Sequence, residues 1–179
     1  MQKIARPETS RAKARGWSWN FRWRRCMDEA NIHASCIAVG RHGVLLLGKS
    51  GSGKSDLALR LIDQGAVLVA DDRTILYVNK GLLHARAPAS IKGLLEVRGV
   101  GIVKLQFRAN IRVSLAVRLG RETARLPAPR SYDPPQPLSP KSQVPEILLN
   151  GRLASAPAKI RTALAAYTEG LFVDTFSAK

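Results

Sequence analysis

The sequence is poor in cysteine and contains no long hydrophobic run. Its two cysteines, Cys26 and Cys36, do not form a C-x-x-C pair and are too few for a disulfide framework. We therefore expect a protein of the reducing cytoplasm, in which Cys36 is a small buried apolar residue. No stretch approaches the roughly 18 apolar residues of a membrane-spanning helix, so a membrane is not an expected partner.

Acidic residues are also scarce, with 13 Asp and Glu against 29 Lys and Arg and a formal net charge of +16. The first 25 residues hold eight basic residues and one acidic residue, and they lack the apolar core of a secretory signal. Tryptophans lie among these arginines, a combination that can stack on nucleic acid: Trp17, Trp19 and Trp23. We favour a basic, disordered extension over residues 1–26, or a protein that starts at Met27, so nucleic acid is not an expected partner.

The 179 residues, with 45% hydrophobic content, suit one domain with a single core, and residues 27–179 are the expected α/β domain. The expected strands are residues 34–39, 44–47, 67–70, 74–78, 82–85, 102–107 and 111–117. The expected helices are residues 54–64 and 156–167. Between Leu126 and Pro145 the many prolines predict irregular structure, since proline has no amide hydrogen and fixes φ.

A glycine-rich segment carries the strongest functional signal. It fits G-x-x-x-x-G-K-[ST] at every fixed position, follows an expected strand and opens an expected helix, which is the context such a motif requires. Backbone amides of such a loop cradle phosphates, while its lysine reaches the β- and γ-phosphates and its serine ligates Mg²⁺. The sequence therefore predicts a site for ATP and Mg²⁺ at these residues: Gly48, Lys49, Ser50, Gly51, Ser52, Gly53, Lys54 and Ser55.

Acidic side chains accompany this loop. Asp71 and Asp72 follow an apolar strand, and ligands of α/β sheets bind at the carboxyl ends of strands. One carboxylate can hold Mg²⁺, for which Asp71 is the candidate, and the other can accept a proton from a nucleophile. A simple turn is the alternative. Glu96 lies in an apolar run, so its carboxylate needs a positively charged partner. Mg²⁺ and Arg98 are equally possible partners at the level of sequence.

Three segments resemble the HPr kinase/phosphorylase family. They are N-I-H-A-S from Asn31, the glycine-rich loop with its helix and L-V-A-D-D, and L-L-E-V-R-G-V-G-I from Leu94. The resemblance is strong over residues 31–105. It implies a P-loop-containing α/β kinase domain related to phosphoenolpyruvate carboxykinase, with a mixed sheet and flanking helices. Because fewer than 35 residues precede His33, the expected form is a short one with only the catalytic domain of the family.

The resemblance also implies an activity. Family members transfer the γ-phosphate of ATP to a serine of HPr, the phosphocarrier of the sugar phosphotransferase system, and thereby regulate carbon metabolism; they form hexamers. Carried over by position, Asp72 resembles the catalytic base, and His33 resembles the histidine that assists this base. Without the resemblance, His33 would be interpreted as an ordinary surface or core histidine. Lys54 resembles the phosphate-binding lysine, and Ser55 and Glu96 resemble the Mg²⁺ ligands.

An arginine of the family that stabilises the transferred group lies in an R-L-G context. Arg125 in A-R-L-P is the first candidate for it, and Arg118 in V-R-L-G is the second. The family's P-x-x-x-G-R-N loop, which is tied to dephosphorylation, has no match, and the nearest region, residues 145–152, differs. The expectation therefore covers the kinase reaction and does not extend to the phosphorylase reaction.

Two other functions stay open at the level of sequence. A P-loop kinase of a small acidic metabolite would use the same loop. A non-catalytic ATP-binding regulatory module would bind nucleotide without needing Asp72 or His33, so the presence of both favours an enzyme. The basic composition suits a protein substrate with acidic patches, because opposite charges steer association.

Overall fold

The computed structural model describes residues 28–122 and 124–173. The basic extension expected over residues 1–26 lies outside the described residues. The main sheet has nine strands in two directions, and its strands are β1 (Glu29–Ile32), β2 (Ala34–Val39), β3 (His42–Leu47), β4 (Val67–Ala70), β5 (Thr74–Asn79), β6 (Leu82–Arg86), β9 (Ile111–Leu119), β10 (Arg130–Tyr132) and β11 (Val144–Leu149).

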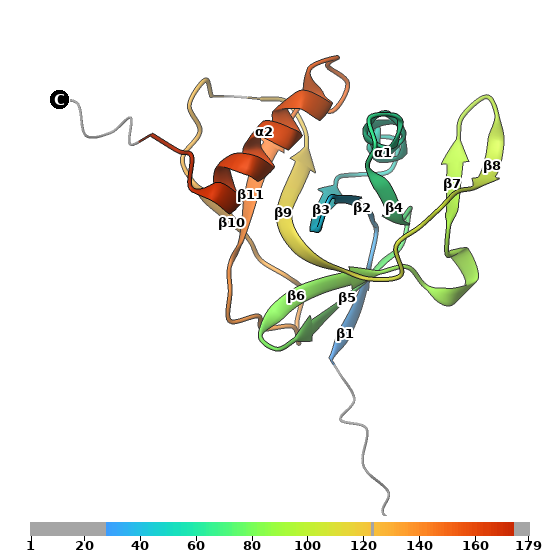
Figure 1. The fold of residues 1–179 in the computed structure, drawn as a ribbon, viewed down its shortest axis with the longest axis horizontal. Helices are drawn as coiled ribbons and strands as arrows, with labels where there is room; N and C mark the ends of the chain where they lie inside the picture. Colours follow the sequence, from blue (N-terminus) through green and yellow to red (C-terminus); the bar gives the residue numbers. More distant parts are fainter. Residues whose placement is uncertain (1–27, 123, 174–179) are drawn as a thin grey trace, which may run out of the picture.

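The sheet is strongly curled around β9. Its strand order is β1-β5-β6-β9-β3-β2-β4, and β11 also pairs with β9 and carries β10 at its other edge. The start of β9 pairs with β6, while its end pairs in parallel with β11, so this one strand bends from one part of the sheet to the other (Figure 1). The β3–β9 pair is also parallel and the other pairs are antiparallel, which confirms the prediction of a mixed sheet.

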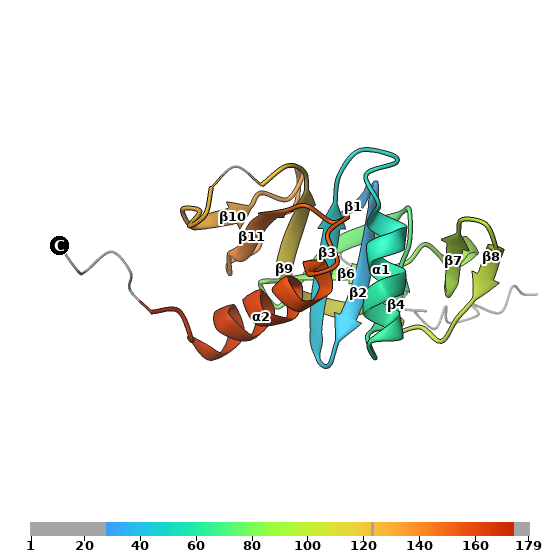
Figure 2. The ribbon, with the colours of Figure 1, turned by 90° about the horizontal axis from the view of Figure 1, so that it is seen from above.

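The remaining elements of residues 28–122 and 124–173 are two α-helices, a short 3₁₀ turn and a separate hairpin. They are α1 (Lys54–Asp63), α2 (Ala156–Glu169), η1 (Ala89–Ile91), β7 (Leu94–Val97) and β8 (Gly101–Lys104). The β7–β8 hairpin stands apart from the main sheet in both orthogonal views (Figures 1 and 2). Neither α-helix in the described part of the chain has the length and apolar character that a membrane span requires.

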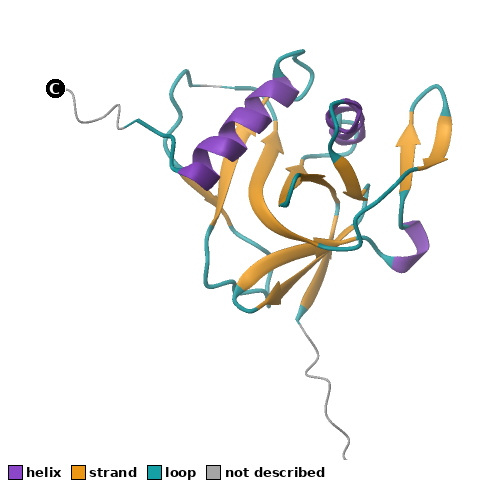
Figure 3. Cartoon of the chain, in the orientation of Figure 1, coloured by secondary structure: helices purple, strands orange, loops and turns teal. Residues whose placement is uncertain are grey.

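Both predicted hairpins and both predicted helices are confirmed. β2 pairs with β3 and β5 with β6, each across a short turn. Helix α2 has proline in its first turn and ends at Gly170, whose φ of 70° is the left-handed cap that glycine adopts readily. Figure 3 shows the two helices, the strands and the loops that connect them.

Two sequence-based expectations are corrected. Residues 102–107 do not form one strand, because β8 ends at Lys104 and Phe107 makes only an isolated bridge to Leu68. The proline-rich segment is not wholly irregular, since β10 lies inside it. The three residues of β10 contain no proline. Pro145 of β11 pairs with Ser131, but β11 pairs with β9 only from Glu146 onward, so the proline lies where β11 has a partner strand on one side alone.

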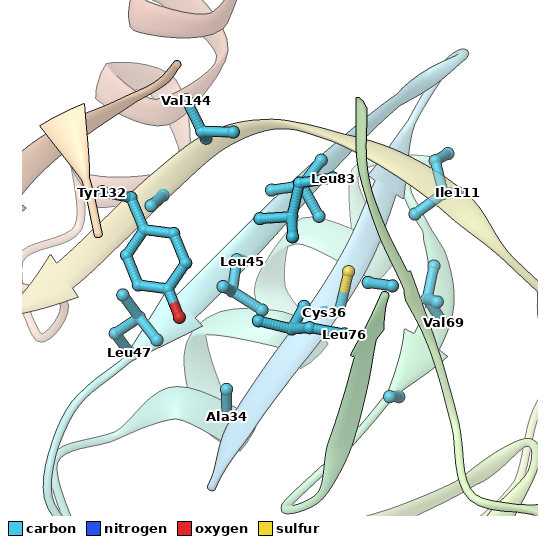
Figure 4. Close-up of a cluster of buried hydrophobic side chains, with 14 of the residues drawn as sticks. Ala34, Cys36, Leu45, Leu47, Val69, Leu76, Leu83, Ile111, Tyr132 and Val144 are labelled. Atoms are coloured by element: carbon cyan, nitrogen blue, oxygen red, sulfur yellow. The ribbon is translucent and has the colours of Figure 1, made fainter. Parts of the chain in front are cut away.

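Alternation along the central strands divides the core into two clusters. On β3, Val44 and Leu46 face α1 and α2, while Leu45 and Leu47 face the interior of the curled sheet. Cys36 belongs to the second cluster (Figure 4), and its burial raises the pKa of its thiol to about 12. The prediction that Cys36 is a buried apolar residue is confirmed.

Removing a core side chain should therefore cost far more than removing an exposed one. Leu46→Ala should lower the free energy of unfolding by about 2–5 kcal/mol, because Leu46 is fully buried between β3 and the helices. The control Val100→Ala removes a side chain that is 74% exposed in the β7–β8 hairpin and should change this free energy by less than about 0.5 kcal/mol. Urea denaturation measures both, and equal losses would contradict the assigned packing.

Candidate active site

The glycine-rich loop connects β3 to α1, and its conformation requires glycine. Gly53 has a φ of 92° and caps α1, a backbone conformation that residues with a side chain rarely adopt. A Cβ at Gly48 would lie 2.6 Å from the hydroxyl oxygen of Ser52, so a side chain there would force Ser52 or the loop to shift. The loop thus presents backbone amides at the start of a ten-residue helix, a geometry that favours bound anions.

Lys54 lies on the buried face of α1. That face consists of Lys54, Leu57, Ala58 and Leu61, the i, i+3, i+4, i+7 pattern of a helix side packed on a sheet. The Lys54 ammonium donates to the carbonyl oxygens of Gly48 at 3.0 Å and Lys49 at 3.1 Å. Burial lowers the pKa of Lys54, and the negative charges of Asp72 and Asp71 oppose that shift.

His33 connects this lysine to Asp72. Its Nε2 lies 2.9 Å from the Lys54 ammonium, and its Nδ1 lies 3.0 Å from the Asp72 carbonyl oxygen and 3.1 Å from Asp72 Oδ1. An ammonium can only donate, so Nε2 accepts and Nδ1 carries the hydrogen that it donates to Asp72. A continuous chain of contacts therefore runs from the glycine-rich loop to a carboxylate.

Asp72 holds an unusual backbone conformation. It follows β4 directly and has a φ of 61°, in the left-handed region that non-glycine residues seldom occupy. Its side chain is 68% exposed, so the carboxylate is accessible to a second molecule. Strained residues of this kind concentrate at functional sites.

Asp71 has the opposite environment, with 5% of its surface exposed. Its Oδ1 accepts hydrogen bonds from the Ser55 hydroxyl at 2.9 Å and the Ser35 hydroxyl at 2.6 Å. Ser35 was not predicted as a site residue. The available signal was a serine within the apolar strand β2, where a buried hydroxyl needs a partner.

A cleft of about 420 Å³ gathers most of the predicted site residues. His33, Lys54, Ser55, Asp72 and Glu96 all line it, although Glu96 comes from the separate β7–β8 hairpin. The loop residues Ser50, Gly51 and Gly53 line it as well. Segments that are far apart in sequence thus meet at one cleft.

The two candidate arginines, Arg125 and Arg118, do not line the cleft. Arg125 is exposed between β9 and β10 and does not line the cleft. Arg118 forms a bidentate pair with Glu146 at 2.9 and 2.8 Å, and is therefore engaged elsewhere. Arg98 and Arg152 line the cleft. The signal for Arg152 was the Gly-Arg pair within residues 145–152.

The predicted metal ligands fit Mg²⁺ by chemistry. In the described residues, no group of three or more His, Cys, Asp or Glu side chains forms a ready-made metal cage. Ser55 and Asp71 nonetheless place hard oxygen donors in contact beside the loop, and Glu96 lines the same cleft. Mg²⁺ is commonly held by one or two such side chains together with substrate phosphates and water.

Comparison with known proteins identifies the family. Residues 24–124 match the model of the HPr Serine kinase C-terminal domain, which is more than half of the chain. The match places the chain in a family named for a kinase, with the glycine-rich loop, Asp72 and Glu96 inside the matched region. The chain belongs to the HPr serine kinase C-terminal domain family.

The similar proteins carry consistent names. The chain is 36% identical over 102 residues to an HPr kinase/phosphorylase of Polaromonas sp., covering 52% of this chain and 32% of the relative. It is 37% identical over 107 residues to the protein of the same name from Caldicellulosiruptor bescii, covering 52% and 34%. The chain thus spans about a third of the length of these curated relatives.

A solved structure extends the likeness to the fold. The Hpr(Ser) kinase/phosphatase from Coxiella burnetii superposes with a TM-score of 0.67 and 25% sequence identity, over 79% of this chain and 97% of that chain. The curled mixed sheet with its helices is therefore shared between the two molecules.

The His33 contacts predict a specific tautomer. Nitrogen NMR of the histidine side chains should show His33 with hydrogen on Nδ1 at pH 8, because Lys54 donates to Nε2. In Lys54→Met this preference should weaken, since the donor to Nε2 is gone. A wild-type His33 ring with its hydrogen on Nε2 would contradict the contact with Lys54. The signals that disappear in His33→Gln identify those of His33.

Proposed function

We propose that this chain is an ATP- and Mg²⁺-dependent protein kinase that phosphorylates a serine of an HPr-type phosphocarrier. The observation that carries the proposal is the contact of Lys54 and Asp72 with the two nitrogens of His33, beside a loop built for phosphate. Family membership supports the HPr kinase type of function. An ATP-binding regulatory module would not need an exposed carboxylate held in a strained backbone.

The proposed reaction is an in-line transfer. The serine oxygen forms a bond to the γ-phosphorus, the bond to the ADP oxygen breaks, and the serine proton passes to the Asp72 carboxylate. His33 positions Asp72 through its Nδ1 hydrogen bond. The ammonium of Lys54 moves from the loop carbonyls to the β- and γ-phosphates, whose charge it neutralises.

Mg²⁺ belongs to the same proposal. Ser55 and Asp71 would hold it, with Glu96 as a further oxygen donor, and it supplies charge neutralisation on the phosphates. The structure brings Ser55 and Asp71 into contact through the hydroxyl hydrogen bond. The carboxylate that accepts this bond is buried, so its oxygen is already oriented toward the loop.

An arginine completes the charge balance at the transferred group. We assign this role first to Arg152, because it lines the cleft, and keep Arg125 as the alternative carried over from the resemblance. We further propose that the fold is a P-loop kinase domain related to phosphoenolpyruvate carboxykinase, that it assembles as a hexamer, and that it acts in the cytoplasm. The phosphorylase reaction is not part of the proposal.

The direct test is phosphorylation of the HPr protein from the same organism. Purified protein with [γ-³²P]ATP and Mg²⁺ should label an HPr serine, and Asp72→Asn should reduce the rate about 10²–10⁴-fold because the base is lost. Asp63→Asn is the matched control, since Asp63 is exposed at the C-terminal end of α1 and does not line the cleft; it should retain the wild-type rate.

Two outcomes would count against the assignment. ATP binding without any label on HPr would exclude HPr as substrate and point to another phosphate acceptor. Full activity in Asp72→Asn would remove Asp72 from the role of base while leaving the kinase assignment in place.

The arginine assignment has its own comparison. Arg152→Ala should lower kcat at least tenfold with ATP affinity measured in parallel, because removing a charge beside the transferred group costs transition-state stabilisation. Arg125→Ala should change kcat less than Arg152→Ala, since Arg125 does not line the cleft. A larger loss of kcat in Arg125→Ala than in Arg152→Ala would show that Arg125 is the assisting arginine, as the resemblance implies, and that Arg152 is not.

A further inference from the structure

A cavity of about 300 Å³ lies at the end of the sheet opposite to the glycine-rich loop. His42, the first residue of β3, lines it, whereas the loop follows the other end of the same strand. Its other walls come from β6, from the start of β9, from β11 with the two residues before it, and from the last turn of α2. None of these residues lines the cleft of the candidate active site, so the two hollows are separate.

A β-bulge places a polar side chain at this cavity. The register between β3 and β9 shifts by one residue after Gly43, which leaves Ser114 of β9 without a partner on β3. The Ser114 hydroxyl lies 3.1 Å from His42 Nδ1, so it holds the imidazole in a defined orientation. Bulges are rare between parallel strands, and they re-aim side chains beside functional sites. The bulge therefore indicates a site at this end of the sheet.

Arg112 of β9 supplies positive charge to the cavity. In the part of the chain that the structure describes, none of the ion pairs includes this arginine. Burial lowers the pKa of His42, and the positive charges of Arg41 and Arg112 lower it further. The negative charge of Glu169 acts in the opposite direction. A bound anion would offset this excess of positive charge, because an opposite charge nearby stabilises the charged form of a basic group.

Two hydrogen bonds hold the wall formed by the segment before β11. The Lys141 amide donates to the Gly81 carbonyl oxygen at 2.8 Å, which ties this segment to the turn between β5 and β6. The Ser131 hydroxyl donates to Gln143 Oε1 at 3.1 Å. Ser142 and Gln143 therefore present a hydroxyl and an amide at a preformed cavity.

We infer that this cavity binds a small hydroxylated organic anion, whose single carboxylate or phosphate group pairs with Arg112. The planar fork of an arginine suits both groups, because two of its N–H donors can reach two oxygens of either one. The volume is at the lower end of the range for small-molecule pockets, so a compact metabolite fits better than a nucleotide. Glu169 and the C-terminal end of α2 add negative charge nearby, which favours a ligand with one charged group over a polyanion.

NMR of the histidine side chains locates binding directly, with the signals of His42 identified by their loss in His42→Gln. The full chain is titrated with glycerate and with glycerol 3-phosphate, which share a hydroxylated body and differ in the charged group. At least one of them should shift the His42 signals with a Kd of about 1 mM or lower, and glycerol, the uncharged analogue, should not. A shift with glycerate alone identifies a carboxylate site, and a shift with glycerol 3-phosphate alone identifies a phosphate site.

The arginine is tested by two substitutions. Arg112→Ala should weaken this binding at least about tenfold, because a charge-assisted contact is lost. Arg112→Lys keeps the charge without the planar fork and should bind with an intermediate affinity. Arg130→Ala is the matched control, since Arg130 is an exposed arginine on β10 that does not line the cavity; it should bind as the wild type does.

Four results would overturn the inference. His42 signals that move with neither anion would exclude the site, and an equal shift with glycerol would exclude recognition of the charge. Unchanged affinity in Arg112→Ala would remove this arginine from the contact. A shift of the His33 signals without any shift at His42 would place the anion at the glycine-rich loop. The kinase proposal is unaffected by each of these results, because the cavity and the cleft share no residue.

Discussion

The position of one buried ammonium organises the candidate site. Lys54 sits on the face of α1 that packs against the sheet, and only 5% of its surface is exposed although it lines the cleft. It is stabilised there by loop carbonyls and by His33, and burial still lowers its pKa. The present acceptors of the Lys54 ammonium are neutral carbonyl oxygens and an imidazole nitrogen. Negatively charged phosphate oxygens would attract this ammonium more strongly, because electrostatic interactions are stronger inside a protein than in water. The His33 ring that accepts from Lys54 also contacts Asp72, whose φ is 61°.

Much of the fold could be predicted from the sequence, because its signals are local. The hairpins β2–β3 and β5–β6, and helices α1 and α2, have turn residues and periodicity that act within a few residues. The curl of the sheet could not be predicted, since it depends on β9 pairing with β6 at one end and β11 at the other. Nor could β10, whose pairing with β11 is determined by tertiary contacts across a proline-rich segment.

The candidate site, like the fold, contains residues that could be predicted from the sequence and residues that could not. The motif predicted the loop, and the resemblance predicted His33, Asp72 and Glu96, all of which the structure gathers at one cleft. Ser35 was missed because a single serine in an apolar strand gives no sequence signal for the carboxylate it will meet. Arg152 was passed over because its loop departs from the family pattern, and its place at the cleft depends on Arg60 of α1, which holds that loop through two backbone carbonyls.

The most direct measurement of the central claim is a structure of the protein with Mg²⁺ and a non-hydrolysable ATP analogue. In that structure the Lys54 ammonium should leave His33 Nε2 and contact the β- and γ-phosphates, with the γ-phosphate facing Asp72. An analogue bound away from the glycine-rich loop, with the Lys54–His33 contact of 2.9 Å unchanged, would contradict it.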